Sequence, residues 1–259
     1  MSPDEYLYSL LGTEAVDTGP NSPALQAQAF LMPAVREWAG NQLASVQPSG
    51  SFAKGTANRR GTDIDLLISL KPTVSETLKE IYWKLDDRFI ELGYKPRHQN
   101  VSLRIKVEGV DVDLVPGKQQ EDGGTDHSLY RRRADTWTKT NVATHIKTVK
   151  EAGRQGETRL LKIWRDTQGL EFPSFHLELA VIAAIGYARL APQGAVGTWT
   201  GNMTAIFRYL RDSFENARIV DPANTNNIIS EDLTKAEKAK IRAAAIEALA
   251  ATHWSDVLR

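Results

Sequence analysis

The sequence contains no cysteine. The protein therefore has no disulfide bond, no thiol nucleophile and no zinc site with cysteine ligands. An excess of charge of either sign is also missing, because 32 Lys and Arg balance 32 Asp and Glu. A formal net charge of zero argues against a protein that coats long nucleic acid, whereas a local basic patch can still bind phosphates.

Long hydrophobic runs are absent as well. No apolar run reaches the roughly 18 residues that a membrane-spanning helix requires, and residues 1–20 lack the basic and apolar regions of a signal peptide. We therefore expect a cytoplasmic protein with no membrane partner. The hydrophobic residues, 41% of the chain, include six Trp, seven Tyr and seven Phe, enough for a sizeable core in one large domain or two small ones.

The hydrophobic pattern changes near the middle of the chain. Apolar residues recur at helical spacing over 24–46 and over 74–92, which predicts two helices. The segment Pro48-Ser49-Gly50-Ser51 ends the first of them. Short β-branched or apolar runs predict strands at 64–70, 101–107 and 110–115. From Thr140 onward the pattern predicts helices at 142–152, 156–168, 174–190, 202–217 and 231–251. The sequence thus predicts an α+β protein, with a small sheet joined to a helical bundle that the long N-terminal helix braces.

The chemistry-bearing residues lie around the first two strands. Gly50 and Ser51 form a turn at which backbone amides and a hydroxyl can hold phosphate oxygens. Asp63 and Asp65 are two residues apart, so that a strand places both carboxylates on one face and Ile64 in the core. Adjacent carboxylates raise each other's pKa unless a cation neutralises them, and a hard divalent ion is the natural partner.

A second acidic pair, Asp111 and Asp113, lies in the strand-like segment VDVDLVP. For either pair alone, solvent-facing positions on an edge strand are the better explanation. Aspartate is depleted in strands, however, so two acidic strands beside a Gly-Ser turn favour a site for metal and phosphate.

These motifs in this order resemble a known active-site signature. Gly50-Ser51, Asp63-Ile64-Asp65 and Asp113 before Leu114-Val115-Pro116 resemble the polymerase β-like nucleotidyltransferase superfamily. The segments ETRLLKIWRD, FPSFHLELAVIAAI and VDPANTNNI resemble the helical half of oligoadenylate synthetases and of the bacterial cGAS/DncV-like nucleotidyltransferases (CD-NTases); they span 157–166, 172–185 and 220–228. The zinc-bearing insertion of animal cGAS cannot exist in a chain without cysteine, so its sensing of double-stranded DNA is not carried over.

The resemblance implies a set of site residues. In that family three carboxylates are catalytic and hold two Mg²⁺ ions, for which Mn²⁺ can substitute; here they are Asp63, Asp65 and Asp113. Asp111 is assigned no catalytic role. The residues that bind the nucleotide are Gly50 and Ser51 at the triphosphate, Lys162 at phosphates, and Ser174 and Phe175 at the sugar and base. A surface lysine at 162 and a core phenylalanine at 175 are the alternatives.

The resemblance also implies a function and a division of the chain. Residues 1–138 would form the nucleotidyltransferase core with the N-terminal helix, and residues 139–259 the helical domain. The enzyme would join nucleoside triphosphates such as ATP or GTP into a short cyclic oligonucleotide and release pyrophosphate, as in bacterial anti-phage (CBASS) signalling. No long nucleic acid is expected as a partner, and a downstream effector would bind only the product.

Two other functions are compatible with the same residues. One is an enzyme that adds nucleotides to an acceptor such as RNA, or that makes linear oligonucleotides. The other is a non-catalytic nucleotide-binding regulator, which the intact set of carboxylates disfavours. Residues 131–165 carry ten Lys or Arg against three acids, and this stretch is either a solvated basic face or an attractor of nucleotides.

Overall fold

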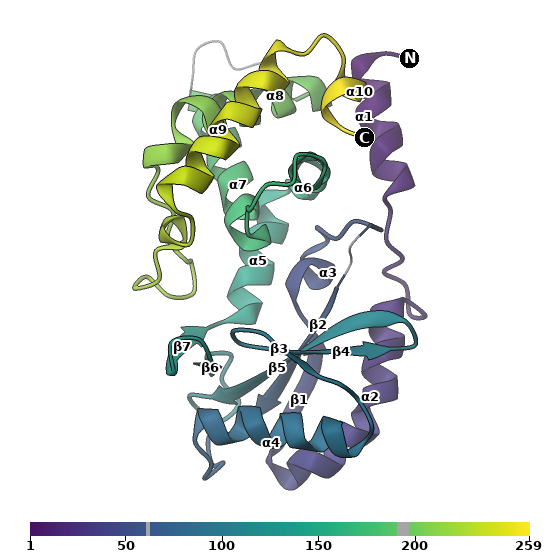
Figure 1. Ribbon diagram of the computed structural model, residues 1–259, viewed down its shortest axis with the longest axis vertical. Coiled ribbons are helices and arrows are strands. Elements are labelled where there is room, and N and C mark those ends of the chain that lie inside the picture. Colours follow the sequence, from purple (N-terminus) through teal and green to yellow (C-terminus); the bar gives the residue numbers. More distant parts are fainter. Residues whose placement is uncertain (61–62, 191–196) are drawn as a thin grey trace. The chain divides into compact units, whose positions relative to one another are not determined.

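The computed structural model describes residues 1–60, 63–190 and 197–259. Gly61 and Thr62, which the sequence places just before the first acidic pair, lie outside the described residues. The chain divides into two compact units (Figure 1). The sheet unit comprises Asp17–Gly55 and Gly61–Lys147, and the helical unit comprises Met1–Val16, Thr56–Arg60 and Thr148–Arg259.

The sheet unit is built on seven described strands. Five of them lie side by side in the order β1 (Leu43–Pro48), β2 (Ile64–Leu70), β5 (Val110–Gln119), β4 (Leu103–Val107) and β3 (Arg97–His98). The other two lie off this path: β6 (His127–Arg131) pairs with β5, and β7 (Thr136–Thr140) pairs with β6. The strands β2 and β5 run parallel, and the other pairs are antiparallel.

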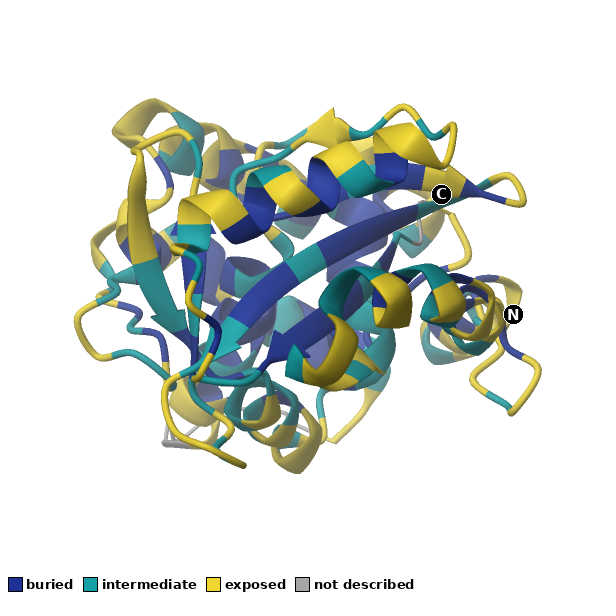
Figure 2. Ribbon diagram, turned by 90° about the horizontal axis from the view of Figure 1, so that it is seen from below, coloured by how far each residue is buried: buried dark blue, intermediate teal, exposed yellow. Residues whose placement is uncertain are grey.

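The two faces of the sheet differ because side chains alternate along a strand. Ile64, Leu66 and Ile68 of β2 are buried in one cluster with apolar residues of α2 (Pro23–Ala39) and α4 (Leu78–Glu91). These two helices therefore cover that face, and Figure 2 shows their buried inner and exposed outer stripes. The opposite face carries the alternate residues, among them Asp65 of β2 and Asp111 and Asp113 of β5.

The sheet extends further than the sequence predicts. The helix predicted over 24–46 ends at Ala39, because Gly40 adopts a positive φ of 54°, and a short 3₁₀ turn (Gly40–Gln42) leads into β1. β1 then pairs antiparallel with β2 from Leu43 to Pro48, so pairing across the sheet overrides the local helical pattern. The structure also adds β6 and β7, which the sequence analysis did not predict.

The helical unit contains α1 (Pro3–Thr13), α6 (Gln155–Thr167), α7 (Ser174–Leu190), α8 (Trp199–Asp212), α9 (Lys235–Ala250) and the short α10 (Trp254–Val257). Helix α5 (Val142–Ala152) contains the boundary between the units, and 3₁₀ turns lie at Phe214–Asn216 and Ile229–Glu231. Leu7 and Leu11 of α1 are buried in the same core as Trp164 of α6. The N-terminal helix that packs with the bundle is therefore α1, whereas α2 packs on the sheet.

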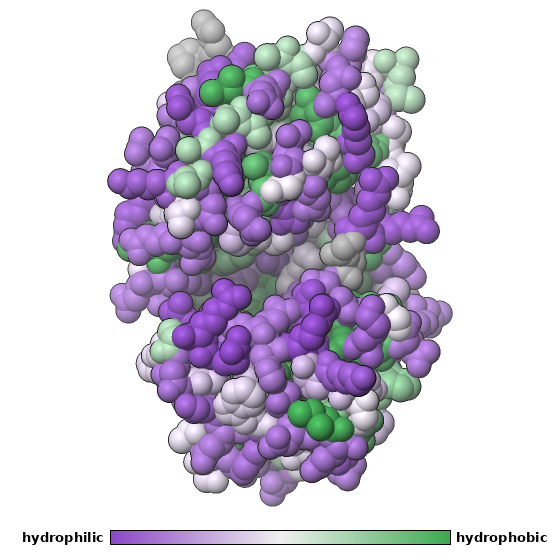
Figure 3. All heavy atoms as spheres, viewed as in Figure 1, coloured by the Kyte–Doolittle hydropathy of each residue, from purple (hydrophilic) through white to green (hydrophobic). Residues whose placement is uncertain are grey.

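The architecture confirms the α+β class predicted from the sequence, with a sheet unit and a bundle of helices. Among the helices of the described chain, none combines the length and the apolar character needed to cross a bilayer. The face of the molecule seen in Figure 3 is mostly hydrophilic, with hydrophobic residues scattered between polar ones.

Candidate active site

The three carboxylates predicted from the sequence meet on the face of the sheet that α2 and α4 leave uncovered. The parallel register of β2 and β5 sets Asp65 directly beside Asp113, and Asp63 immediately precedes β2. Ile64 between the two β2 carboxylates is 1% exposed in the core, as the spacing of the pair predicts. Residues separated by about fifty positions in the sequence thus present hard oxygen ligands in one place.

Gly50 packs directly against this cluster. It has a φ of +58°, and a Cβ atom added there would lie 1.7 Å from Asp65 Oδ2. The contact is fixed by the backbone, because the Ser49 amide donates a 2.8 Å hydrogen bond to the carbonyl of Asp65. Gly50 opens the short helix α3 (Gly50–Lys54), and Ser51 follows in its first turn. A side chain at position 50 would collide with Asp65, so glycine allows the Gly-Ser turn to lie directly against the carboxylates.

The carboxylates are short of compensating charge. Burial and the neighbouring Asp113 carboxylate raise the pKa of Asp65 to about 7, although the Lys54 ammonium opposes this shift. Burial is also the main cause of the raised pKa of Asp63, against the Arg104 guanidinium. Raised carboxyl pKa values mean that the ionised cluster is disfavoured without additional positive charge. A bound cation would supply that charge.

Arg104 is part of the site and was missed by sequence reasoning. The antiparallel register of β4 and β5 sets it opposite Asp113. Its Nε and Nη2 each donate a 2.8 Å hydrogen bond to Asp113, and Nη2 also donates to Asp63. Gln99 Nε2 donates to both oxygens of Asp113, at 3.0 and 3.2 Å. The alternation of Arg104 with buried Leu103 and Ile105 indicated its face, but only the register reveals its partner.

The donor set fits a divalent cation in its chemistry. Three carboxylates are the oxygen ligands that Mg²⁺ and Mn²⁺ prefer. Within the described residues, no group of three or more His, Asp or Glu side chains is already arranged as a metal site. Arg104 is hydrogen bonded to two of the three carboxylates.

Lys162 lies in a buried cluster of the helical unit. It is 5% exposed, and its Nζ donates to the carbonyl and hydroxyl oxygens of Thr56, at 3.1 and 3.2 Å. Its Nζ is 3.3 Å from Oε1 of Glu178, which is 0% exposed and also accepts a hydrogen bond from the Thr56 hydroxyl. Lys162 is therefore a buried member of an ion pair rather than a lysine at the surface. Its partner Glu178 is not among the site residues predicted from the sequence.

Ser174 and Phe175 begin helix α7 in the helical unit. Arg165 Nη1 donates a 3.0 Å hydrogen bond to the Ser174 hydroxyl and a 3.1 Å bond to the carbonyl of Phe172. Phe175 is half-buried and packs against the helical core. The structure thus groups Lys162, Ser174 and Phe175 in the helical unit, whereas Gly50, Ser51 and the three carboxylates belong to the sheet unit.

Several charges in the basic stretch 131–165 have partners inside the protein. Arg132 donates to the carbonyl of Gln99, Lys139 pairs with Asp126 at 2.7 Å, and Arg154 pairs with Glu157 at 3.0 Å. These residues hold the fold together. Lys147 and Lys150 are exposed on α5.

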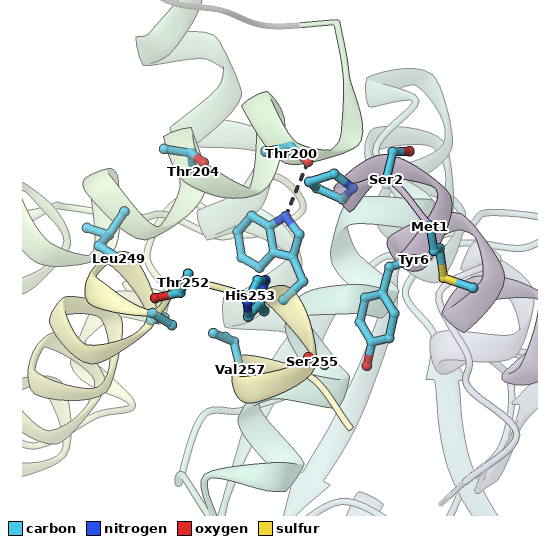
Figure 4. Close-up of a pocket in the computed structure, with 14 residues that line it drawn as sticks. Met1, Ser2, Tyr6, Thr200, Thr204, Leu249, Thr252, His253, Ser255 and Val257 are labelled. Atoms are coloured by element: carbon cyan, nitrogen blue, oxygen red, sulfur yellow. Dashed lines mark hydrogen bonds between the residues drawn. The ribbon is translucent and has the colours of Figure 1, made fainter.

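A separate open pocket of about 660 Å³ lies in the helical unit (Figure 4). Residues of α1, α8 and the α9–α10 segment line it, and Trp254 Nε1 donates a 3.2 Å hydrogen bond to the Thr200 hydroxyl at its edge. None of the residues implicated by the sequence lines this pocket. The carboxylate cluster rather than the pocket is therefore the candidate active site.

Comparison with known proteins identifies the domain that carries this cluster. Residues 34–133 match the family model described as a nucleotidyltransferase domain. The chain is 26% identical over 236 residues to the cyclic AMP-AMP-AMP synthase of Escherichia coli strain MS 115-1, which covers 78% of this chain and 73% of that protein. It is also 34% identical over 116 residues to the CCA-adding enzyme of Sulfurisphaera tokodaii, which covers 44% of this chain and 27% of that enzyme.

Solved structures show the same fold over almost the whole chain. The Bradyrhizobium diazoefficiens CD-NTase CdnG in complex with GTP has a TM-score of 0.76 at 12% identity, covering 96% of this chain and 90% of that one. CdnC of E. coli MS115-1 with ATP has a TM-score of 0.75 at 21% identity, covering 96% and 91%. The resemblance drawn from the sequence motifs is confirmed: residues 34–133 match a nucleotidyltransferase domain, and the chain has the fold of the CD-NTases.

Proposed function

We propose that the protein joins nucleoside triphosphates into a short cyclic oligonucleotide, with Mg²⁺ as cofactor and pyrophosphate as leaving group. The observation that carries the proposal is the cluster of Asp63, Asp65 and Asp113 against Gly50. The acceptor hydroxyl oxygen forms a bond to the α-phosphorus of the donor nucleotide, and the bond from that phosphorus to pyrophosphate breaks. The hydroxyl proton passes to a carboxylate or to water.

The three carboxylates would hold the cations together. Asp63, Asp65 and Asp113 would supply oxygen ligands from one place on the sheet, where the β2–β5 register sets Asp65 beside Asp113. Two Mg²⁺ ions, or Mn²⁺ in their place, would lower the barrier by neutralising the attacking and leaving oxygens. The pKa of Asp65, raised to about 7, supports cation binding, because a bound cation would stabilise the ionised carboxylates that burial and mutual repulsion disfavour.

The same proposal assigns the nucleotide contacts to five residues. The backbone at Gly50 has no side chain in the way of a phosphate, and the Ser51 hydroxyl and amide supply donors for the triphosphate. Lys162 contributes positive charge toward the phosphates while Glu178 keeps it fixed. Ser174 offers a hydroxyl to the sugar, and the half-buried Phe175 ring offers a face to the base.

Ring closure is the finer part of the proposal. A linear intermediate that stays bound can turn its own 5′ triphosphate toward the same carboxylates, so one site suffices for every bond. The similarity to a cyclic AMP-AMP-AMP synthase over 78% of the chain supports this product class. A role in bacterial anti-phage signalling, in which an effector binds only the product, and a cytoplasmic location belong to the same proposal.

A second candidate is the addition of nucleotides to an RNA acceptor. The 34% identity to a CCA-adding enzyme over 116 residues favours it, although that match covers only 44% of this chain. The formal net charge of zero disfavours long RNA as a partner.

One experiment separates the two candidates. The pure protein is incubated with each of the four nucleoside triphosphates and with all of them together, in Mg²⁺ or Mn²⁺ and without nucleic acid. Products are then treated with phosphatase and analysed by mass spectrometry. The proposal predicts phosphatase-resistant cyclic products, whereas products that all keep a phosphatase-sensitive 5′ end, or that require added RNA, would favour the second candidate.

A further inference from the structure

Arg104 lies within the carboxylate cluster of the candidate active site. It is half-buried, with 21% of the side chain exposed, and lies among carboxylates on three sides. Its Nε and Nη2 atoms donate to Asp113, its Nη2 atom donates to Asp63, and its Nη1 atom lies 4.0 Å from Asp111 Oδ2. A planar guanidinium forms strong paired hydrogen bonds of this kind with a carboxylate.

These hydrogen bonds use the oxygen lone pairs that a cation would need. Asp113 is 5% exposed, and each of its oxygens already accepts from Arg104 and from Gln99. A divalent ion and the guanidinium also repel each other at short range. A cation that binds Asp63 and Asp113 must therefore displace Arg104 from at least some of these oxygens.

Asp111 can receive the displaced guanidinium. It lies two residues before Asp113 on β5 and hence on the same face of the sheet. Its Oδ2 accepts a 3.4 Å hydrogen bond from Arg97, while its Oδ1 is buried and accepts no hydrogen bond from any described residue. Lys106 Nζ lies 3.5 Å from this Oδ1. Lys106 therefore offsets the charge of this oxygen but donates no hydrogen bond to it, so the oxygen can still accept one from a displaced guanidinium.

We propose that Arg104 is a built-in counter-cation of the active site, which competes with the divalent ion and moves onto Asp111 when that ion binds. Arg104 then sets the cation concentration at which the site assembles, and Asp111 lowers the cost of displacing it. This inference rests on the proposed function, because it takes Asp63 and Asp113 as cation ligands. It assigns a role to Asp111, an acidic residue that the catalytic assignment leaves unused.

The test is calorimetric titration of Mn²⁺ into the nucleotide-free protein. Arg104→Gln removes the competitor, so the dissociation constant should fall about tenfold or more. Arg36→Gln is the matched control, because it makes the same change of charge at an exposed side chain of α2, the helix that covers the opposite face of the sheet. Its dissociation constant should change by no more than about twofold, since exposed charges are screened. An unchanged or higher dissociation constant for Arg104→Gln would overturn the inference.

Asp111→Asn tests the receiving position. It should weaken Mn²⁺ binding in the wild-type background and have little effect in the Arg104→Gln background, because the displaced group is then missing. An equal effect in both backgrounds would mean that Asp111 acts on the ion directly and would overturn this part. Melting curves in EDTA establish that each variant is folded. If Arg104→Gln does not fold, Arg104→Lys replaces it, since it keeps the charge and loses the paired geometry, and it should still bind Mn²⁺ more tightly than the wild type.

Failure of the inference and failure of the proposed function give different results. If the wild type binds Mn²⁺ and Arg104→Gln binds no tighter, only the role of Arg104 is wrong. If neither the wild type nor Arg104→Gln binds Mn²⁺ at millimolar concentration, the carboxylates are not a cation site and the proposed function fails with the inference.

Discussion

Replacing Gly50 by alanine should damage the active site more than it damages the fold. The new Cβ would lie 1.7 Å from Asp65 Oδ2 and 2.4 Å from its Cγ, distances that atoms do not tolerate. The Asp65 carboxyl must therefore move, since the backbone of both residues is fixed by the Ser49–Asp65 hydrogen bond. A φ of +58° adds strain for any residue with a Cβ.

The two costs can be separated with a second glycine. Gly169 has a φ of +59°, and a Cβ there would meet nothing within 4 Å. Gly169→Ala should lower the free energy of unfolding only through the strain of a left-handed backbone, by about 1–2 kcal/mol. Gly50→Ala should lower it by that amount and by about 1–3 kcal/mol more for overpacking against Asp65. Urea denaturation in EDTA measures both free energies of unfolding.

Activity provides the second readout. Displacing a carboxylate ligand by about 1 Å lowers turnover roughly 100-fold, so Gly50→Ala should lose at least that much nucleotide transfer, whereas Gly169→Ala keeps wild-type activity. In the double variant Gly50→Ala with Asp65→Ala, the stability loss due to Gly50→Ala should shrink, because only the 2.9 Å contact with Asp65 Cβ remains. Equal stability losses at the two glycines, with activity retained in both, would refute the packing argument.

Three other predictions test separate parts of the structure. Lys162→Ala should destabilise the protein by about 3–5 kcal/mol, because it leaves the buried Glu178 carboxylate without its positively charged partner, whereas Lys150→Ala on the surface should change stability little. Lys162→Met with Glu178→Leu should restore stability but not nucleotide use, and recovery of both would limit Lys162 to a structural role. Desolvation, together with the positive charge of Lys238, lowers the pKa of His176 from 6.5 to about 4. The stability that the neutral ring provides is therefore fully present above pH 6.5 and is lost as the pH falls toward 4. His176→Phe should remove on the order of 3 kcal/mol of this acid-induced loss of stability in denaturation curves, and an unchanged pH dependence of stability would contradict this prediction. Asp63→Asn with Asp65→Asn should abolish turnover and leave the melting temperature in EDTA no lower than that of the wild type, because it removes like charges from the cluster; activity above a few per cent would exclude these ligands.

The local patterns predicted most helices and the central strands of the fold. The strand at 64–70 is β2 as predicted, and the helix at 142–152 is α5. The helical pattern of 40–46 was misleading, because β1 is stabilised by pairing with β2 rather than by its own residues. Helix α1 went unpredicted, although Ser2 and Glu5 form a capping box at its start.

The site was predictable to the extent that its residues are close in sequence or share a known motif. The carboxylates and Gly50 could be found in this way, whereas the contact between Gly50 and Asp65 depends on a positive φ that no pattern reports. Arg104 could not be found, since its partner is set by the register of β4 against β5. The buried pair of Lys162 with Glu178 depends in the same way on the packing of α6 and α7.

The most direct test of the central claim is pyrophosphate release from nucleoside triphosphates and Mg²⁺ with no nucleic acid added, measured for the wild type and for Asp113→Asn. The account predicts steady release by the wild type, in step with consumption of the triphosphate, and none above background for Asp113→Asn or in EDTA. Release that begins only when RNA is added, or that persists in Asp113→Asn, would contradict it.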